Sequence, residues 1–311
     1  DKAVFKTGKS IRAGVPVCWP WFGKFERNPQ SVQAMYTGEQ PAPAHGLVRA
    51  MDWELGGIES EADGIKVEFK LPYPEGGLPG WPHQVDLTLT LHLNDQLHIS
   101  LTSHNRGVET VSISQALHTY FAVSDVRNVH VNGVDGLNYI ETLDNWKTNA
   151  QKGDLHFAGE TDRIYLNTPA QLSIVDPAWQ RRIQLRSSGS RSAVLWNPWI
   201  DKARRLSQFA EDAWQGMLCI EHANVLEDVR LLAPGGKVLI ADCFRTEDYQ
   251  GRAAQGPQPG GGHQLTAFQA AVEFDPKLAE GYTALAELEI SQNPGEPQVN
   301  EAIELAKLSV R

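Results

Sequence analysis

Two segments that lie far apart in the sequence each place one ionisable side chain inside an apolar stretch. His118 lies within residues 116–121 and Glu221 within residues 219–222, and both stretches have the composition of buried strands. A strand interior rarely tolerates an imidazole or a carboxylate without a partner or a ligand. One imidazole and one carboxylate are also the minimum set for general acid–base catalysis, so His118 and Glu221 are the first candidate catalytic residues.

Each candidate also has a structural interpretation. A single histidine in a strand is more often a hydrogen-bonded core residue than a catalyst. Glu221 is harder to explain in this way, because glutamate is almost never buried without a partner. His222 alternates to the opposite face of the same predicted strand, so we do not expect it in a site that contains Glu221.

A loop rich in aromatic residues follows Arg12, the first arginine that could bind a ligand. Arg12 precedes Trp19 and Trp21 in a segment that proline punctuates. Aromatic faces stack on sugar rings and arginine forks bind phosphate, so the loop is a candidate binding element. The alternative is a tryptophan-rich corner of the core with a solvated arginine.

A second candidate binding segment begins at His45. It follows residues 24–44, a long stretch rich in proline and polar residues for which no structure is predicted. We expect Gly46 to let the backbone approach a ligand while His45 and Arg49 point into one pocket. The alternative is a surface loop that re-enters a strand.

Asp162 begins a further polar pair. With Arg163 it opens a predicted strand at residues 161–165. Taken alone, adjacent opposite charges are typical of a weak surface ion pair.

The elements that must position these residues are strands. Apolar and polar residues alternate through residues 86–93 and 97–101, with a turn between them, which predicts a β-hairpin. The same period of two runs through residues 67–71, 111–121 and 237–244. Many antiparallel strands without intervening helices predict an all-β protein, either a sandwich or a barrel.

The end of the chain differs in composition. Residues 251–263 contain five glycines and two prolines, which is typical of a flexible linker, and the residues after them have helical spacing. We therefore predict a β domain over residues 1–248, a linker over 249–264 and a short helical appendage over 265–311. The spacing of Ala271, Pro276, Tyr282 and Leu285 is similar to that of a tetratricopeptide repeat, which suggests a protein partner for this segment.

Composition excludes several functions. The net charge of −10 disfavours a nucleic-acid partner. The apolar runs are too short to span a membrane, and no secretory leader opens the chain, so we expect a cytoplasmic protein. Cys18, Cys219 and Cys243 have no metal-ligand spacing and are expected to be buried free thiols. Motifs for a phosphate-binding loop, a zinc protease or a nucleophile elbow are absent, which leaves cofactor-free acid–base chemistry on a small polar molecule.

Together these segments resemble the aldose 1-epimerase superfamily, in particular its hexose-6-phosphate mutarotase branch. The resemblance runs from about residue 5 to residue 244 and joins six motifs in the family's order. The motifs are Ile11–Gly23, Ala44–Arg49, Ala116–Phe121, Thr161–Tyr165, Trp196–Trp199 and Cys219–Glu221.

This resemblance implies a large antiparallel β-sandwich of the galactose mutarotase type, without metal or organic cofactor. It implies an enzyme that interconverts the anomers of a hexose 6-phosphate, as a glucose-6-phosphate 1-epimerase does, and we expect this enzyme to be a monomer. Glu221 would be the general base and His118 the general acid. The implied substrate-binding residues are Arg12, His45, Arg49 and Asp162.

Two departures from the family pattern are expected to matter. The family carries additional N-terminal strands before the Arg12 motif, and the linker and helical segment after Phe244 are not typical of it. Two other functions stay open: a non-catalytic carbohydrate-binding module that stacks sugars on Trp19 and Trp21, and an epimerase for unphosphorylated sugars.

Overall fold

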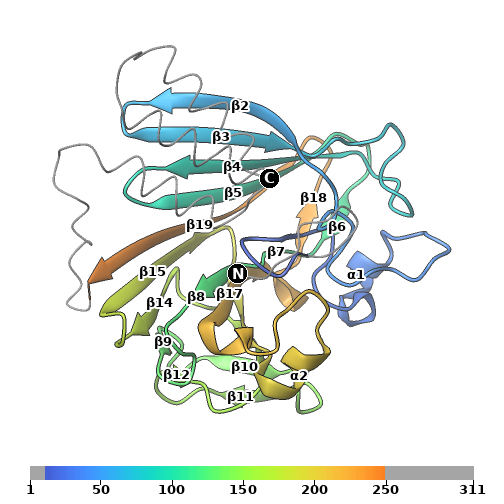
Figure 1. Cartoon of the computed structure of the whole chain (residues 1–311). Coiled ribbons are helices and arrows are strands. Elements are labelled where there is room, and N and C mark those ends of the chain that lie inside the picture. Colours follow the sequence, from blue (N-terminus) through green and yellow to red (C-terminus); the bar gives the residue numbers. More distant parts are fainter. Residues whose placement is uncertain (1–10, 249–311) are drawn as a thin grey trace.

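The computed structural model describes residues 11–248 (Figure 1). The predicted linker, the predicted helical segment with its protein partner, and residues 1–10 lie outside these described residues. Within residues 11–248, no helix has the length and apolar character that crossing a bilayer requires.

Two large antiparallel sheets make up the fold. The eight-stranded sheet has the order β1-β7-β17-β16-β13-β10-β11, and β8 also pairs with β17. Its strands are β1 (Val17–Cys18), β7 (Gln115–Leu117), β8 (Tyr120–Ala122), β10 (Asn138–Glu141), β11 (Lys147–Ala150), β13 (Thr161–Leu166), β16 (Ser192–Asn197) and β17 (Met217–Asn224).

The nine-stranded sheet has the order β12-β9-β14-β15-β19-β5-β4-β3-β2. Its strands are β2 (Glu54–Glu61), β3 (Gly64–Lys70), β4 (Val85–Leu93), β5 (Leu97–Asn105), β9 (His130–Asn132), β12 (Leu155–His156), β14 (Gln171–Asp176), β15 (Arg181–Ser188) and β19 (Lys237–Asp248). A separate two-stranded sheet pairs β6 (Val111–Ile113) with β18 (Arg230–Leu232). The predicted all-β sandwich is confirmed.

Helices are short and lie in the connections. They are η1 (Phe25–Arg27), α1 (Gln30–Gln33), α2 (Trp199–Arg205), η2 (Ala213–Gly216) and η3 (Leu226–Asp228). Two of them, η1 and α1, fall within residues 24–44, so the prediction of an unstructured loop there was wrong. Asn28 stabilises this region, because its side-chain amide donates to the carbonyls of Phe22 and Lys24 at 2.9 and 3.0 Å.

The predicted hairpin is confirmed as β4 and β5. Leu93 pairs with Leu97, and the Asn94 side chain accepts a hydrogen bond of 2.8 Å from the backbone N–H of Gln96, which closes the turn. Leu87 and Leu101 of this hairpin are buried in the core. The alternating pattern therefore correctly marks the face that packs between the sheets.

Residues 111–121 differ from the prediction of one alternating strand. The chain forms three short strands, β6, β7 and β8, and β6 belongs to a different sheet from the other two. Between β7 and β8 the backbone N–H groups of His118 and Tyr120 donate to the carbonyls of Pro16 and Gly14, at 3.0 and 2.9 Å. These bonds interrupt the regular pairing at His118, so this residue lies in a break between strands rather than within one.

The tryptophan loop is part of the core. Trp19 and Trp21 are both 0% exposed, and their indole N–H groups donate to Ser103 Oγ and to the Pro43 carbonyl. A sugar cannot stack on rings without an exposed face. The prediction of a carbohydrate-binding module that stacks sugars on these two rings was therefore wrong. The alternative, a tryptophan-rich corner of the core, is confirmed.

Gly46 also serves the core. Its φ is +78°, and a Cβ at this position would lie 2.0 Å from the carbonyl oxygen of Trp19. The missing side chain lets two backbone segments meet at a bridge between Trp19 and Gly46. The close approach seen at Gly46 is that of the Trp19 backbone, and its expected approach to a ligand stays a prediction.

Candidate functional site

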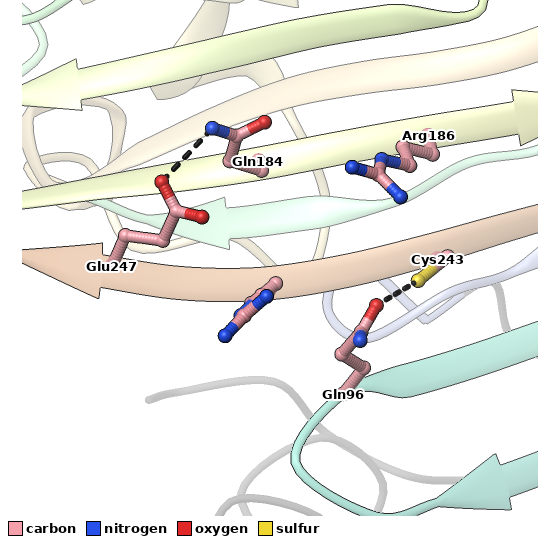
Figure 2. Close-up of a pocket in the computed structure, with 6 residues that line it drawn as sticks. Gln96, Gln184, Arg186, Cys243 and Glu247 are labelled. Atoms are coloured by element: carbon pink, nitrogen blue, oxygen red, sulfur yellow. Dashed lines mark hydrogen bonds between the residues drawn. The ribbon is translucent and has the colours of Figure 1, made fainter. Parts of the chain in front are cut away.

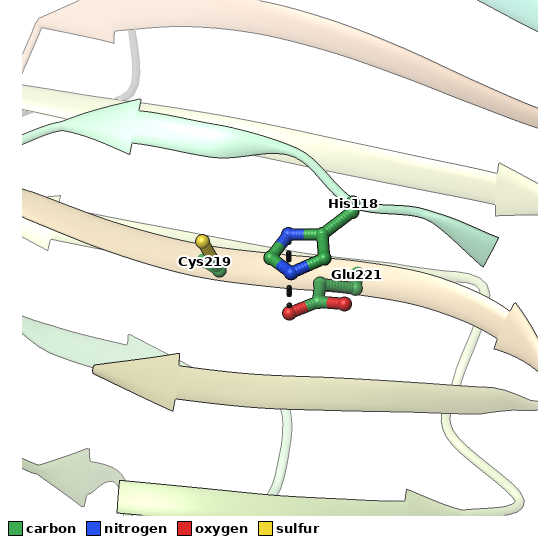
Figure 3. Close-up of side chains that lie close together, drawn as sticks. All are labelled: His118, Cys219 and Glu221. Carbon is green, nitrogen blue, oxygen red and sulfur yellow. Dashed lines mark ion pairs between the residues drawn. The ribbon is translucent and has the colours of Figure 1, made fainter. Parts of the chain in front are cut away.

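His118 and Glu221 meet on the face of the eight-stranded sheet (Figure 3). His118 Nδ1 lies 3.4 Å from Glu221 Oε1, and the two side chains are 7% and 2% exposed. Figure 3 shows the imidazole of His118, from the break before β8, lying over the carboxylate that β17 presents. The fold thus brings together the two residues that were predicted as acid and base.

Strand β17 presents Glu221 because it lies in the interior of the sheet, between β16 on one side and β7 and β8 on the other. Every residue of β17 is buried. Cys219 and Glu221 share one face, since residues two apart in a strand point the same way. His222 points to the other face, where its Nδ1 lies 2.7 Å from Asp242 Oδ1 of β19 and both side chains are 0% exposed. The prediction that His222 lies outside the site is confirmed.

Aromatic rings hold the imidazole of His118. It stacks on Tyr120 with ring centroids 4.9 Å apart and planes 6° apart, and the edge of Trp196 lies 6.0 Å away. His45 is the next ring, 5.5 Å from His118, and its Nδ1 lies 3.5 Å from Cys18 Sγ. These contacts restrict the imidazole to one orientation and place His45 at the same site.

Several buried polar atoms of this region have no hydrogen-bond partner among the described residues. Buried polar groups are nearly always bonded, so a concentration of unbonded ones indicates where a polar ligand binds. They are His118 Nδ1, Glu221 Oε2, Tyr120 Oη and Arg49 Nε.

Both predicted arginines are close to the pair. Arg49 Nη2 donates to the Ile11 carbonyl at 3.0 Å, and Arg12 Nε donates to the Ser207 carbonyl at 2.9 Å. Each contact orients a guanidinium group and leaves it further N–H donors for a ligand. Burial and then the positive charges of Arg49, Arg12 and Lys202 lower the pKa of His45 to about 3, so its imidazole is neutral at pH 7.

The electrostatics of the central pair shift its two groups in opposite directions. Burial lowers the pKa of His118, and the positive charge of Arg49 lowers it further. Burial raises the pKa of Glu221, as does the negative charge of Asp162, while Arg49 opposes that rise. Both shifts favour the uncharged form of the group concerned, because each charge would lie in a buried place, and Arg49 favours the ionised form of Glu221.

Asp162 lies in β13 opposite Trp196 and is held by a cation that sequence reasoning missed. Lys202 Nζ lies 3.8 Å from Asp162 Oδ2 and 3.0 Å from Glu160 Oε1. Burial raises the pKa of Asp162, and the ammonium group of Lys202 opposes this rise. Asp162 therefore pairs with Lys202, and its negative charge raises the pKa of Glu221. The interpretation of Asp162 and Arg163 as an isolated surface ion pair does not describe this arrangement.

Lys202 reaches the site because Asn197 fixes the start of α2. The side-chain oxygen of Asn197 accepts a hydrogen bond from the backbone N–H of Trp199, and its amide donates to the carbonyls of Trp214 and Met217. The sequence signal was the Asn197-Pro198 step, which is typical of a chain reversal after a strand. This step predicts a turn at the start of α2, but it does not predict that the Lys202 side chain points towards Asp162.

The thiols differ from one another. Cys18 and Cys219 are buried as predicted, but Cys243 is half-exposed, so the prediction was wrong for Cys243. Burial raises the pKa of Cys18 to about 12 and also raises that of Cys219. Cys219 Sγ, a ring nitrogen of His118 and a carboxylate oxygen of Glu221 lie within 4.8 Å of one another, which makes them a potential metal-ligand set.

A separate pocket lies on β15 and β19 of the other sheet and contains none of the predicted site residues (Figure 2). Its polar groups are largely paired with each other. Gln184 Nε2 donates to Glu247 Oε2 at 2.9 Å, and Cys243 Sγ donates to Gln96 Oε1 at 2.9 Å. The pocket is thus a polar surface feature of the nine-stranded sheet and lies apart from the His118–Glu221 pair.

Comparison with known proteins agrees with this geometry. The family model described as aldose 1-epimerase matches residues 2–239. A protein of Escherichia coli K12 named "Putative glucose-6-phosphate 1-epimerase" is 34% identical over 225 residues, which are 72% of this chain and 70% of that protein. A protein of the same name from Cenchrus ciliaris is 31% identical over 269 residues, which are 83% of this chain and 74% of that protein.

Among solved structures, one titled "a putative mutarotase (YeaD)" from Salmonella typhimurium aligns with a TM-score of 0.70 and 27% identity, over 80% of this chain and 78% of that one. A second structure, titled HI1317, aligns with a TM-score of 0.62 and 29% identity, over 79% and 78% of the two chains. Both alignments extend over most of the described residues. The chain belongs to the aldose 1-epimerase family of isomerases.

Proposed function

We propose that this isomerase interconverts the α and β anomers of a hexose 6-phosphate. The observation that carries the proposal is the buried pair of His118 and Glu221, which lie 3.4 Å apart, with the positive charges of Arg49 and Arg12 acting on His118. Its relatives' names support the substrate class, because two of them are named for glucose 6-phosphate.

Burial favours the neutral forms of both groups, so the proposed reaction starts once the single proton of the pair lies on His118. The Glu221 carboxylate then removes the proton of the anomeric hydroxyl while His118 gives its proton to the ring oxygen. The bond between C1 and the ring oxygen breaks, which opens the ring to the aldehyde. Rotation about the C1–C2 bond presents the other carbonyl face, and closure returns each proton along the same route. The pair holds one proton in total throughout, so the reaction needs no external acid or base.

The remaining residues bind the substrate in this proposal. Arg12 and Arg49 donate to the 6-phosphate, for which forked guanidinium donors are suited. Asp162 accepts a hydrogen bond from a sugar hydroxyl, and neutral His45 lines the site. Arg49 has a second function, because its charge opposes the effect of burial on the pKa of Glu221 and thus favours the ionised base.

The test is anomer exchange measured by NMR magnetisation transfer. Exchange between α- and β-glucose 6-phosphate should be faster with protein than in the same buffer without it. A folded sample that leaves the exchange rate unchanged refutes the proposal. Equal acceleration for glucose and glucose 6-phosphate would refute the phosphate-binding role of the arginines and support an epimerase for unphosphorylated sugars.

We also propose that the enzyme acts in the cytoplasm as a monomer, with its small-molecule substrate as its partner. The buried free thiols Cys18 and Cys219 support a reducing compartment. Light scattering during gel filtration should give the mass of one 34.4 kDa chain. A dimer mass would contradict the monomer.

A further inference from the structure

The proposed catalytic pair has a third neighbour that the acid–base reaction does not use. Cys219 lies two residues before Glu221 on the same face of β17, and Figure 3 shows its sulfur close to the imidazole of His118. The possible ligand atoms of the three residues lie within 4.8 Å of one another. All three residues are buried, with Cys219 0%, Glu221 1% and His118 5% exposed.

The spacing of two of these atoms matches a metal site. His118 Nδ1 and Glu221 Oε1 are 3.4 Å apart and do not meet as a hydrogen bond. Two ligands that each lie about 2.1 Å from a tetrahedral zinc ion are separated by about 3.4 Å. The two atoms could therefore bind one ion without a change in their separation.

The ligand atoms are also available and firmly held. His118 Nδ1 and Glu221 Oε2 are buried without a hydrogen-bond partner in the described part of the chain. Glu221 and Cys219 lie on an interior strand, and the backbone N–H of His118 is bonded to the Pro16 carbonyl. A site whose ligands are already placed needs little reorganisation to bind.

We propose that His118, Cys219 and Glu221 bind Zn²⁺ and that the bound ion switches the enzyme off. A thiolate, an imidazole and a carboxylate together select zinc over magnesium, because magnesium prefers oxygen ligands alone. On binding, the Cys219 thiol and the His118–Glu221 pair each lose one proton to solvent and a zinc–sulfur bond forms, with no change of oxidation state. The thiolate and the carboxylate balance the two positive charges of the ion, although Arg49 lies nearby.

Zinc should inhibit the enzyme because two of its ligands are the proposed acid and base, so the inhibition rests on the proposed function. The metal occupies the lone pair of His118 Nδ1 and the carboxylate of Glu221, so neither group can transfer a proton to or from a sugar. Binding itself does not depend on the reaction. The two statements are therefore tested separately.

Binding is measured first with Co²⁺ as a spectroscopic substitute for Zn²⁺. The described residues contain one other potential metal group, formed by Glu61, Asp63 and His92, so the titration uses the His92→Gln background. We expect the near-ultraviolet absorption of a thiolate–Co²⁺ bond. Cys219→Ser should abolish this band and weaken Co²⁺ binding by at least about tenfold, since even loss of an outer-shell partner costs 10- to 100-fold.

Cys243→Ser is the matched control, because Cys243 is a free thiol outside the site, and it should retain the band. X-ray absorption of the zinc-loaded His92→Gln protein requires no change at the site and should show one sulfur at about 2.3 Å. A spectrum with only nitrogen and oxygen ligands, or a Co²⁺ band that persists in Cys219→Ser, overturns the proposal.

The second arm measures anomer exchange with added metal. Zn²⁺ should suppress exchange, Mg²⁺ should not, and a chelator should restore it. The residual exchange of Cys219→Ser should resist Zn²⁺ at concentrations that inhibit the parent protein at least tenfold. If zinc binds through Cys219 while exchange continues, the inhibitory switch is overturned. If no exchange occurs without metal, the proposed function fails and the binding result still stands.

Discussion

Replacement of Glu221 by glutamine is the most direct test of the proposed chemistry. Glu221→Gln keeps the shape of the side chain but removes its ability to accept a proton at neutral pH. Because Glu221 is 1% exposed, bulk water cannot easily take over as the base. His118 lies 3.4 Å away, but in the proposed reaction it is the acid.

The expected loss is therefore large. A positioned general base contributes about 100- to 10,000-fold to rate, which is about 3–5 kcal/mol of activation free energy. We expect a loss in the upper part of this range, since burial excludes replacement by solvent. Magnetisation-transfer NMR on glucose 6-phosphate measures this change directly against the spontaneous rate in buffer.

Glu221→Gln should lower the reaction rate without lowering the free energy of unfolding. Because burial raises the pKa of Glu221, the folded protein binds the proton of this group more tightly than the unfolded chain does. The parent protein therefore loses stability as the pH rises from the unfolded value towards the folded one, and Glu221→Gln does not. At pH 7 the variant should be at least as stable as the parent in urea.

This combination separates chemistry from folding. Glu59→Gln is the control, because Glu59 forms an exposed pair with Lys66 far from the site in the other sheet. An active Glu221→Gln protein would refute the assignment of the base. An inactive variant that is also strongly destabilised would refute the account of the buried carboxylate.

Three substitutions and one titration test the surroundings of the pair. Arg49→Ala should raise the KM for glucose 6-phosphate at least tenfold with little effect on glucose, whereas Arg106→Ala, which removes an exposed pair with Asp86, should change neither. Lys202→Met should raise the pKa of Asp162 in carboxyl NMR titrations because an opposing cation is lost, and an unchanged midpoint would contradict the pairing. His45 should show no NMR titration midpoint between pH 5 and 8, because its pKa is lowered to about 3, and its contribution to stability should fall as the pH drops from the unfolded value of 6.5 towards 3. His222→Leu should cost about 3–5 kcal/mol in urea unfolding because it leaves Asp242 buried and unpaired, and adding Asp242→Leu should recover much of that loss.

Much of this architecture follows from local sequence patterns. The β4–β5 hairpin was predictable, because alternation and an Asn-Asp-Gln turn are both local signals. The buried character of residues 218–225 likewise predicted β17 and made Glu221 conspicuous. These features depend on neighbours in the sequence, so a single chain is sufficient to find them.

Other features depend on contacts between distant segments. The break at His118 arises from backbone bonds to Gly14 and Pro16, about a hundred residues earlier, and alternation carries no information on it. Lys202 reaches Asp162 only because Asn197 sets the start of a short helix. The burial of Trp19 is similarly a tertiary fact, since a proline-rich aromatic loop looks the same whether it lines a site or fills a core.

The placement of Glu221 beside His222 on one interior strand has a consequence for folding. Because side chains alternate along a strand, a shift of β17 by a single residue against β16 and β7 would turn the Glu221 carboxylate towards Asp242 and the His222 imidazole towards His118. Such a misfolded chain would bury two carboxylates together and lose the inter-sheet pair at the same time. The alternation of Glu221 and His222 therefore makes a one-residue register shift of β17 costly in free energy. We expect that compact, inactive molecules with this shifted register do not accumulate.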